Sequence, residues 1–163
     1  MKTEEIQKPT PADFRRPDVI TAALTVLRCR AFAATMRTAV DKIGQALLET
    51  THPLTDDDGE RITSTRWAWR AYSGEGWAAW RAACVSQEHK TGLRVHGWND
   101  ELCPALVAEE ETRQAERALI DLSGERFGVT HGKLMSHADG MANREKWLEL
   151  TLNLALSSKG DVR

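Results

Sequence analysis

A run of apolar residues at three- and four-residue steps, beginning just after Pro17 and ending near Glu49, constrains the fold of this chain most. Such steps place side chains on one face of an α-helix, and the run contains no internal proline. Proline is tolerated at a first helical position because its missing N–H has no helical partner to lose. The run therefore predicts one long amphipathic helix over 17–49, or two nearly collinear helices. The apolar positions are Ile20, Leu24, Leu27, Ala31, Phe32, Met36, Val40, Ile43 and Leu47.

Three further helices are predicted over residues 65–90, 104–122 and 143–156, the last of them capped by Asn143. A loop with one helical turn is expected near 130–136. The final helix has few polar positions, so it should lie deep in the core. Between the first two helices, the turn signal Asp58-Gly59 predicts a short turn or hairpin insertion near 54–63. The fold class expected is all-α, as a four-helix, largely antiparallel bundle.

The ends of the chain differ in character from its middle. Residues 1–16 are polar, are interrupted by Pro9 and Pro11, and have no periodic apolar face, so we expect a flexible N-terminal arm. A single helical domain is expected over 17–157, followed by a disordered tail over 158–163. A chain of 163 residues is close to the usual size of one domain.

Composition favours a cytoplasmic protein. Neither a signal peptide nor 18 consecutive apolar residues is present, which predicts no membrane segment. The three cysteines, Cys29, Cys84 and Cys103, are widely spaced and are consistent with reduced thiols. Lysine and arginine total 22 against 24 aspartates and glutamates. This balance argues mildly against a dedicated binder of duplex nucleic acid, which is usually basic.

A tryptophan–arginine segment offers a candidate anion-binding or nucleic-acid-binding face. On one helix, Arg66, Arg70, Trp77 and Arg81 gather on one side, where guanidinium groups contact phosphates and an indole stacks on a base in single-strand binders. The alternative is a solvated face with Trp77 packed under an arginine stem. A separate apolar stripe is expected to be core; it consists of Trp69, Tyr72, Trp80 and Ala83.

A second candidate site is a zinc centre formed by Cys84, His89, His96 and Cys103. Two thiolates and two imidazoles make a suitable tetrahedral set. Only the first pair has the close spacing that structural zinc sites use. The alternative is a buried Cys84, a Cys103 near a helix start and two exposed histidines, with no cofactor.

Catalytic motifs are missing from the sequence: it has no phosphate-binding glycine loop, no H-E-x-x-H and no G-x-S-x-G. Glu109, Glu110, Glu111 and Glu116 on the third helix lack the Glu-x-x-His partners of di-metal bundles. We expect them to form a solvated acidic face, answered by arginines such as Arg113 through an i,i+4 pair with Glu109. The sequence therefore favours a non-enzymatic role.

Two segments carry a resemblance. Residues 103–120, with CPALVAE and AERALI, and residues 143–152, NREKWLELTL, resemble small, uncharacterised helical proteins encoded by bacteriophages and prophages. The resemblance implies a bacterial host cytoplasm and a role in genome handling or host-defence interference. We therefore expect an accessory protein that binds a protein partner or forms a homo-oligomer, with single-stranded nucleic acid as the alternative partner. A long helix with a spare apolar edge also favours self-association.

Overall fold

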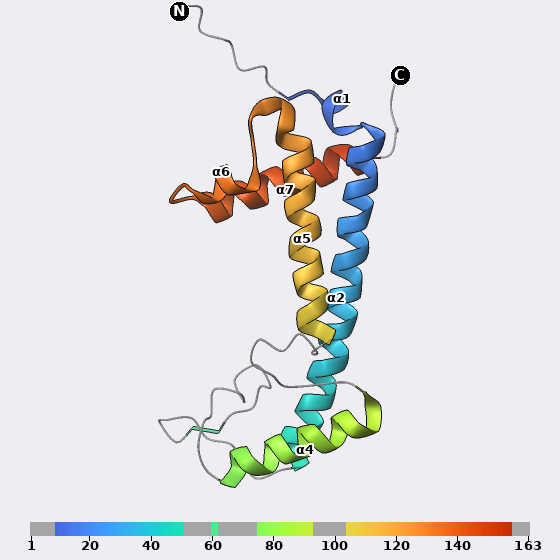
Figure 1. Ribbon diagram of the computed structural model, residues 1–163, viewed down its shortest axis with the longest axis vertical. Helices are drawn as coiled ribbons and strands as arrows, with labels where there is room; N and C mark the ends of the chain where they lie inside the picture. Colours follow the sequence, from blue (N-terminus) through green and yellow to red (C-terminus); the bar gives the residue numbers. More distant parts are fainter. Residues whose placement is uncertain (1–8, 51–59, 62–74, 93–103, 158–163) are drawn as a thin grey trace, which may run out of the picture. The chain divides into compact units, whose positions relative to one another are not determined.

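The protein is all-α, as the sequence predicts. The computed structural model describes residues 9–50, 60–61, 75–92 and 104–157 (Figure 1). The predicted helix after Pro17 is one continuous element. The helices are α1 (Pro11–Phe14), α2 (Pro17–Thr50), α4 (Glu75–Thr91), α5 (Pro104–Gly124), the 3-10 turn η1 (Glu125–Phe127), α6 (His131–Met135) and α7 (Gly140–Leu156). Of the expected hairpin near 54–63, only Glu60 and Arg61 are described, and Arg61 takes part in an isolated β-bridge.

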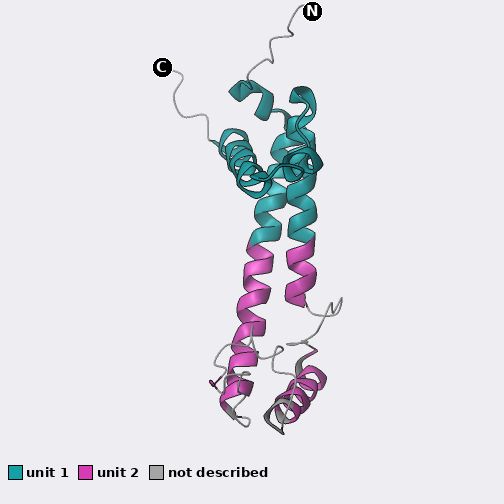
Figure 2. Cartoon of the chain, turned by 90° about the vertical axis from the view of Figure 1, so that its left-hand side faces the viewer, with its two compact units in different colours: residues 1–30, 111–163 teal, residues 31–110 magenta. Residues whose placement is uncertain are grey.

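The helices are distributed over two compact units, coloured separately in Figure 2. Unit 1 comprises residues 1–30 and 111–163, and unit 2 comprises residues 31–110. The long helices α2 and α5 contribute to both units, whereas α7 belongs to unit 1 and α4 to unit 2. Helices are described in all four predicted ranges, although residues 65–74 of the range 65–90 lie outside the described residues. The buried side chains of the described residues form two clusters.

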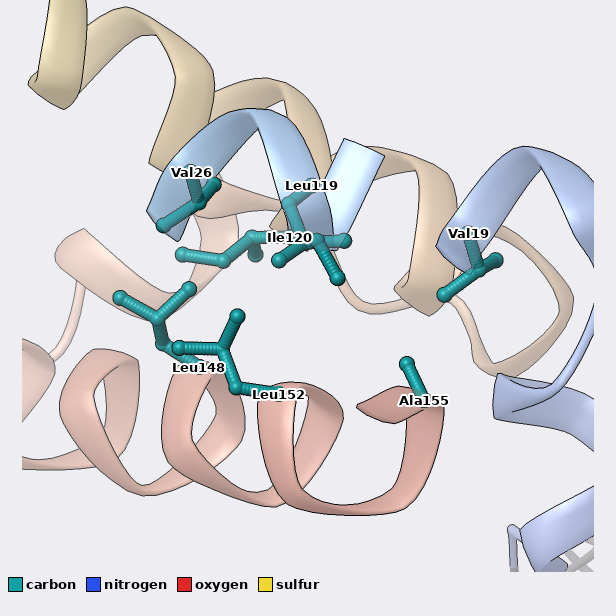
Figure 3. Packing of buried hydrophobic residues seen from close by; sticks show 8 residues of the cluster. Val19, Val26, Leu119, Ile120, Leu148, Leu152 and Ala155 are labelled. Carbon is teal, nitrogen blue, oxygen red and sulfur yellow. The ribbon is translucent and has the colours of Figure 1, made fainter. Parts of the chain in front are cut away.

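In unit 1, the core forms where α7 packs against α2 and α5. Figure 3 shows Leu148 and Leu152 of α7 pointing toward Ile120 of α5. Leu148 and Ile120 are fully buried, and fully burying such side chains contributes roughly 1.5–3 kcal/mol each. The buried members are Val19, Ala23, Val26, Leu119, Ile120, Leu148, Leu152 and Ala155.

The first turns of α2 bury a different face from the one that the apolar pattern indicated. Val19, Ala23 and Val26 are buried, whereas Leu24 and Leu27 are exposed. This half of α2 is apolar on both sides, so periodicity alone could not decide which side faces the core. In unit 2 the prediction fails at Ala31 and Phe32, which are exposed, and holds from Met36 onward. Val40 is buried, and Met36, Ile43 and Leu47 pack against the same cluster, which also contains Leu48, Trp80, Cys84 and Ala105.

The prediction of a flexible arm over 1–16 includes residues that are helical and packed in the structure. Residues 11–14 form α1, and Phe14 is fully buried against the rings of Trp147, at 5.8 Å between centroids, and Phe127, at 6.4 Å. Thr10 and Asp13 make a capping box that begins this helix. Four residues are too few to show an apolar period, so the sequence pattern does not indicate α1.

The last helix also differs from its prediction. It begins at Gly140, with Asp139 rather than Asn143 at its N-cap position, and Asn143 lies in the first turn. The helix does not lie deep in the core. One face is buried through Leu148, Thr151 and Leu152, while Glu145 and Leu150 are exposed.

Candidate protein-binding surface on α2

The structure describes only part of the arginine–tryptophan face predicted from the sequence. Arg81 is exposed on α4, beside a surface hollow that it lines with Ala78, Ala82 and Val85. Arg66 and Arg70 lie outside the described residues, as does the side chain of Trp77. The nucleic-acid face stays a prediction. For the apolar stripe of the same segment, Trp80 is fully buried, as expected, while Trp69 and Tyr72 are not described.

The first pair of the predicted zinc ligands lies on α4. Cys84 is buried in the unit 2 cluster, and this burial raises the pKa of its thiol to about 12. His89 is exposed. Five residues of α-helix separate the two side chains by roughly 140° around the helix axis, so they point to different sides. His96 and Cys103 lie outside the described residues. Within the described part of the chain, no cluster of three or more metal-ligating side chains is found. Zinc binding stays a prediction.

Two glutamates of α5, Glu109 and Glu116, form ion pairs across helices, whereas Glu110 and Glu111 are exposed, as expected for a solvated acidic face. Glu109 forms an ion pair with Arg37 of α2 at 2.6 Å, in addition to any pair with Arg113, its predicted i,i+4 partner. Glu116 is nearly buried and lies between two guanidinium groups, with Arg30 of α2 at 2.8 Å and Arg144 of α7 at 2.6 Å. Burial alone would raise the pKa of Glu116, but the hydrogen bonds and charges of Arg144 and Arg30 outweigh it and lower that pKa.

The Arg30–Glu116–Arg144 cluster joins α2 to α5 and α7 on the buried side of α2 in unit 1. Arg30 also reaches Glu149 of α7 at 3.3 Å, so one α2 side chain is tied to both neighbouring helices. Because Arg30 lies on the same side of α2 as Ala23 and Val26, its ion pairs hold that side inward. The opposite side, which carries Leu24, is thereby held outward. Sequence reasoning missed this cluster, because its paired members are 28 and 86 positions apart in the chain.

The outward side of α2 in unit 1 is the strongest candidate for a functional surface. We call it the outer face and define it by five exposed residues: Thr21, Leu24, Thr25, Leu27 and Arg28. Leu27 lies at the edge of this face next to the buried side, roughly 40° around the helix from Ala23. Leu24 is 42% exposed and Leu27 is 43% exposed. Arg28 is the one charged residue among the five. The exposed Asp18 lies one helical turn before Thr21 on the same side of α2, so this side carries one positive and one negative charge.

The two threonines of the outer face contribute methyl groups more than hydroxyl groups. The Thr21 hydroxyl donates to the Pro17 carbonyl oxygen at 2.9 Å, and the Thr25 hydroxyl donates to the Thr21 carbonyl oxygen at 3.0 Å. Each hydroxyl is satisfied within its own helix. What a neighbouring chain would meet at these positions is largely hydrocarbon.

By length and composition alone, α2 is apolar enough to cross a membrane. The span Pro17–Glu49 has an 18-residue window of mean hydropathy 1.4, of which 22% is buried. Arginines within the span argue for a different environment, because a charge at the centre of a bilayer is costly. Arg28 lies on the outer face itself, and Arg30 is already held by carboxylates of this chain.

The outer face thus combines exposed leucines, threonine hydroxyls that are hydrogen-bonded within the helix, and one arginine. Ion pairs of Arg30 lie on the other side of the same helix. Comparison of the chain with protein-family models, with curated proteins and with solved structures finds no significant match.

Proposed function

We propose that this chain is a non-enzymatic binding protein that holds an apolar helix of another polypeptide chain against the outer face of α2. The observation that carries the proposal is the exposure of Leu24 and Leu27 on a helix whose other side is already filled. A helix that is apolar on both sides normally has neighbours on both sides. In unit 1, α5 and α7 supply only one of them.

The expected affinity is moderate. Fully burying a leucine contributes roughly 1.5–3 kcal/mol, so completing the burial of two leucines that are about two-fifths exposed adds about 1–2.5 kcal/mol in total. The threonine methyls and the stem of Arg28 add to this value. Association also costs translational and rotational freedom, which leaves a reversible complex rather than a permanent one.

The sequence resemblance supports a setting for this role. Segments 103–120 and 143–152 resemble helical proteins of phages and prophages, and we place the binding role accordingly in the cytoplasm of an infected bacterium. There the protein would act as an accessory factor in genome handling or in interference with host defence. The outer face carries one arginine with Asp18 beside it and so has no positive excess, which suits a protein surface better than a phosphate backbone.

A site-specific photocrosslinker tests the proposal. The reactive residue is placed at Leu24 and, as a matched control, at Leu150, which is 41% exposed on α7. Irradiation of cells that produce the protein should yield a discrete protein adduct from position 24 and none from position 150. Equal adducts from both positions, no adduct from position 24, or transfer of the label to lipid would each contradict the proposal.

A further inference from the structure

The short helix α1 is attached to the rest of unit 1 by one aromatic anchor. Of its four residues, Phe14 is fully buried, whereas the first two are exposed. The Phe14 ring is stacked on Phe127, with the two centroids 6.4 Å apart, and is tilted against Trp147, with centroids 5.8 Å apart. Both distances are favourable for ring pairs. One side chain therefore supplies the buried part of α1.

The polar contacts around this anchor are open to water. Asp13 accepts a hydrogen bond from the Arg126 guanidinium at 3.2 Å, and the side chain of Arg126 is 64% exposed. Directly after α1, the Arg15 guanidinium donates to the Ser157 hydroxyl at 3.2 Å, and both residues are exposed. Such exposed pairs contribute little to stability, because water replaces them readily. The cost of releasing α1 is therefore set mainly by the Phe14 ring.

The residues that receive Phe14 are held in place by contacts outside α1. The Trp147 indole N–H donates to the Ser123 hydroxyl at 2.9 Å, and Ser123 is buried. Phe127 belongs to η1, which continues directly from α5, and its ring centroid lies 6.1 Å from that of Trp147. None of these contacts involves α1. The two rings therefore form an aromatic site that α1 fills but does not build, with the Arg126 cation beside it.

The rings and the cation together specify the kind of peptide that fits. Aromatic side chains are the usual anchors of protein–protein contacts, and two rings at this spacing accept a third one. A guanidinium beside them favours a carboxylate. In α1, the carboxylate and the anchor are the consecutive residues Asp13 and Phe14.

We infer that Phe127, Trp147 and Arg126 form a peptide-binding site for an acidic residue followed directly by an aromatic residue. The helix α1 is the chain's own ligand for this site, and a segment of a partner protein with the same pair of residues displaces it. The site shares no residue with the outer face of α2, so it is a second binding surface, independent of the proposed function. Because two residues join α1 to α2, α1 competes at a high effective concentration.

Peptide titration of the full chain, followed by NMR, tests the inference. The probe is a capped synthetic peptide with the sequence of residues 9–16, and the readout is the indole N–H signal of Trp147, identified with a Trp147→Phe variant. A Phe14→Ala variant leaves the site open and should bind the peptide with a dissociation constant on the order of 1 mM or below, because a short tether closes α1 at an effective concentration in that range. The wild type should bind at least about tenfold more weakly, because α1 occupies the site in most molecules.

Two matched controls separate specific recognition from adhesion to exposed rings. A peptide with alanine in place of its phenylalanine should leave the Trp147 signal unshifted. A Phe14→Ala/Arg126→Glu variant should prefer a peptide with lysine in place of its aspartate by about twofold to fivefold, since an exposed ion pair contributes a factor of that size.

Five results would overturn the inference. They are no saturable binding to Phe14→Ala up to about 5 mM peptide, binding to the wild type as tight as to Phe14→Ala, equal binding of the peptide without phenylalanine, an unchanged charge preference in the Arg126→Glu variant, and loss of helical content in Phe14→Ala by circular dichroism. The last result would show that α1 builds the site instead of filling it.

Discussion

Removing the carboxylate of Glu116 should destabilise unit 1 strongly. In a Glu116→Ala variant, Arg30 can regain water because its side chain is 33% exposed, but Arg144 cannot, because its side chain is 9% exposed. Leaving one member of a buried ion pair uncompensated typically costs 3–5 kcal/mol. Arg144 keeps a second pair with Glu145, which is half exposed, so we take the lower end and expect a loss of about 3 kcal/mol.

The same reasoning makes an opposite prediction for the double variant Glu116→Leu/Arg144→Leu. Both charges are then absent, and no buried ion is left without its partner. A buried ion pair replaced by apolar side chains of similar size is often neutral or stabilising, so this variant should lie within about 1 kcal/mol of the wild type. Most of the loss seen in Glu116→Ala would be recovered.

Urea unfolding followed by circular dichroism measures both variants. Hydrogen exchange of the α7 amides is a second readout, because it reports on unit 1 alone. A loss below about 1 kcal/mol in Glu116→Ala would refute the burial argument for Arg144. A double variant as unstable as the single one would show that the ion pairs stabilise unit 1 in their own right.

Three further outcomes follow from single positions. The pKa of Glu116 is lowered from its ordinary value of 4.5, so the ionised carboxylate stabilises the folded protein fully above that value. This contribution is lost as the pH falls through the folded-state pKa. Melting temperatures should therefore fall more steeply between about pH 6 and pH 3 in the wild type than in Glu116→Gln. Gly140→Ala should destabilise the protein by at least about 1 kcal/mol, since its Cβ would lie 2.6 Å from a backbone oxygen of α6, whereas Gly132→Ala, which meets nothing within 4 Å, should be neutral or slightly stabilising in the same urea assay. Cys84 should resist alkylation at about pH 8 while the half-buried Cys29 reacts sooner, as peptide mass spectrometry would show; equal rates would contradict the burial of Cys84.

The sequence was informative about helix positions and much less so about which sides the helices bury. The helices α2 and α5 begin at Pro17 and Pro104, as predicted, and α5 ends at Gly124, two residues beyond the predicted end. Residue spacing is local information, and helix boundaries depend on local capping and turn chemistry.

Face assignment failed where the local pattern gave two equivalent answers. Leu24 and Val26 are both apolar, and the Val26 side of α2 is held inward by residues far along the chain: the core side chains of α5 and α7, and Glu116, which pairs with Arg30 from 86 residues away. The buried Arg144 was equally hidden, because an arginine inside a helix normally predicts a solvated position. Leu24 and Leu27 of the outer face were expected in the core for the same reason: residue spacing alone does not show which side of a helix is buried.

The threonine hydroxyls that bond within α2 have a consequence for handling the protein. Scales that score each residue type by itself count Thr21 and Thr25 as polar and would rate this stretch as ordinary surface. Because both hydroxyls donate to backbone carbonyl oxygens of α2, the exposed surface of each side chain resembles that of valine. The purified chain should accordingly be retained on phenyl-substituted chromatography media longer than its composition suggests, and concentrated stocks should be most soluble at low salt.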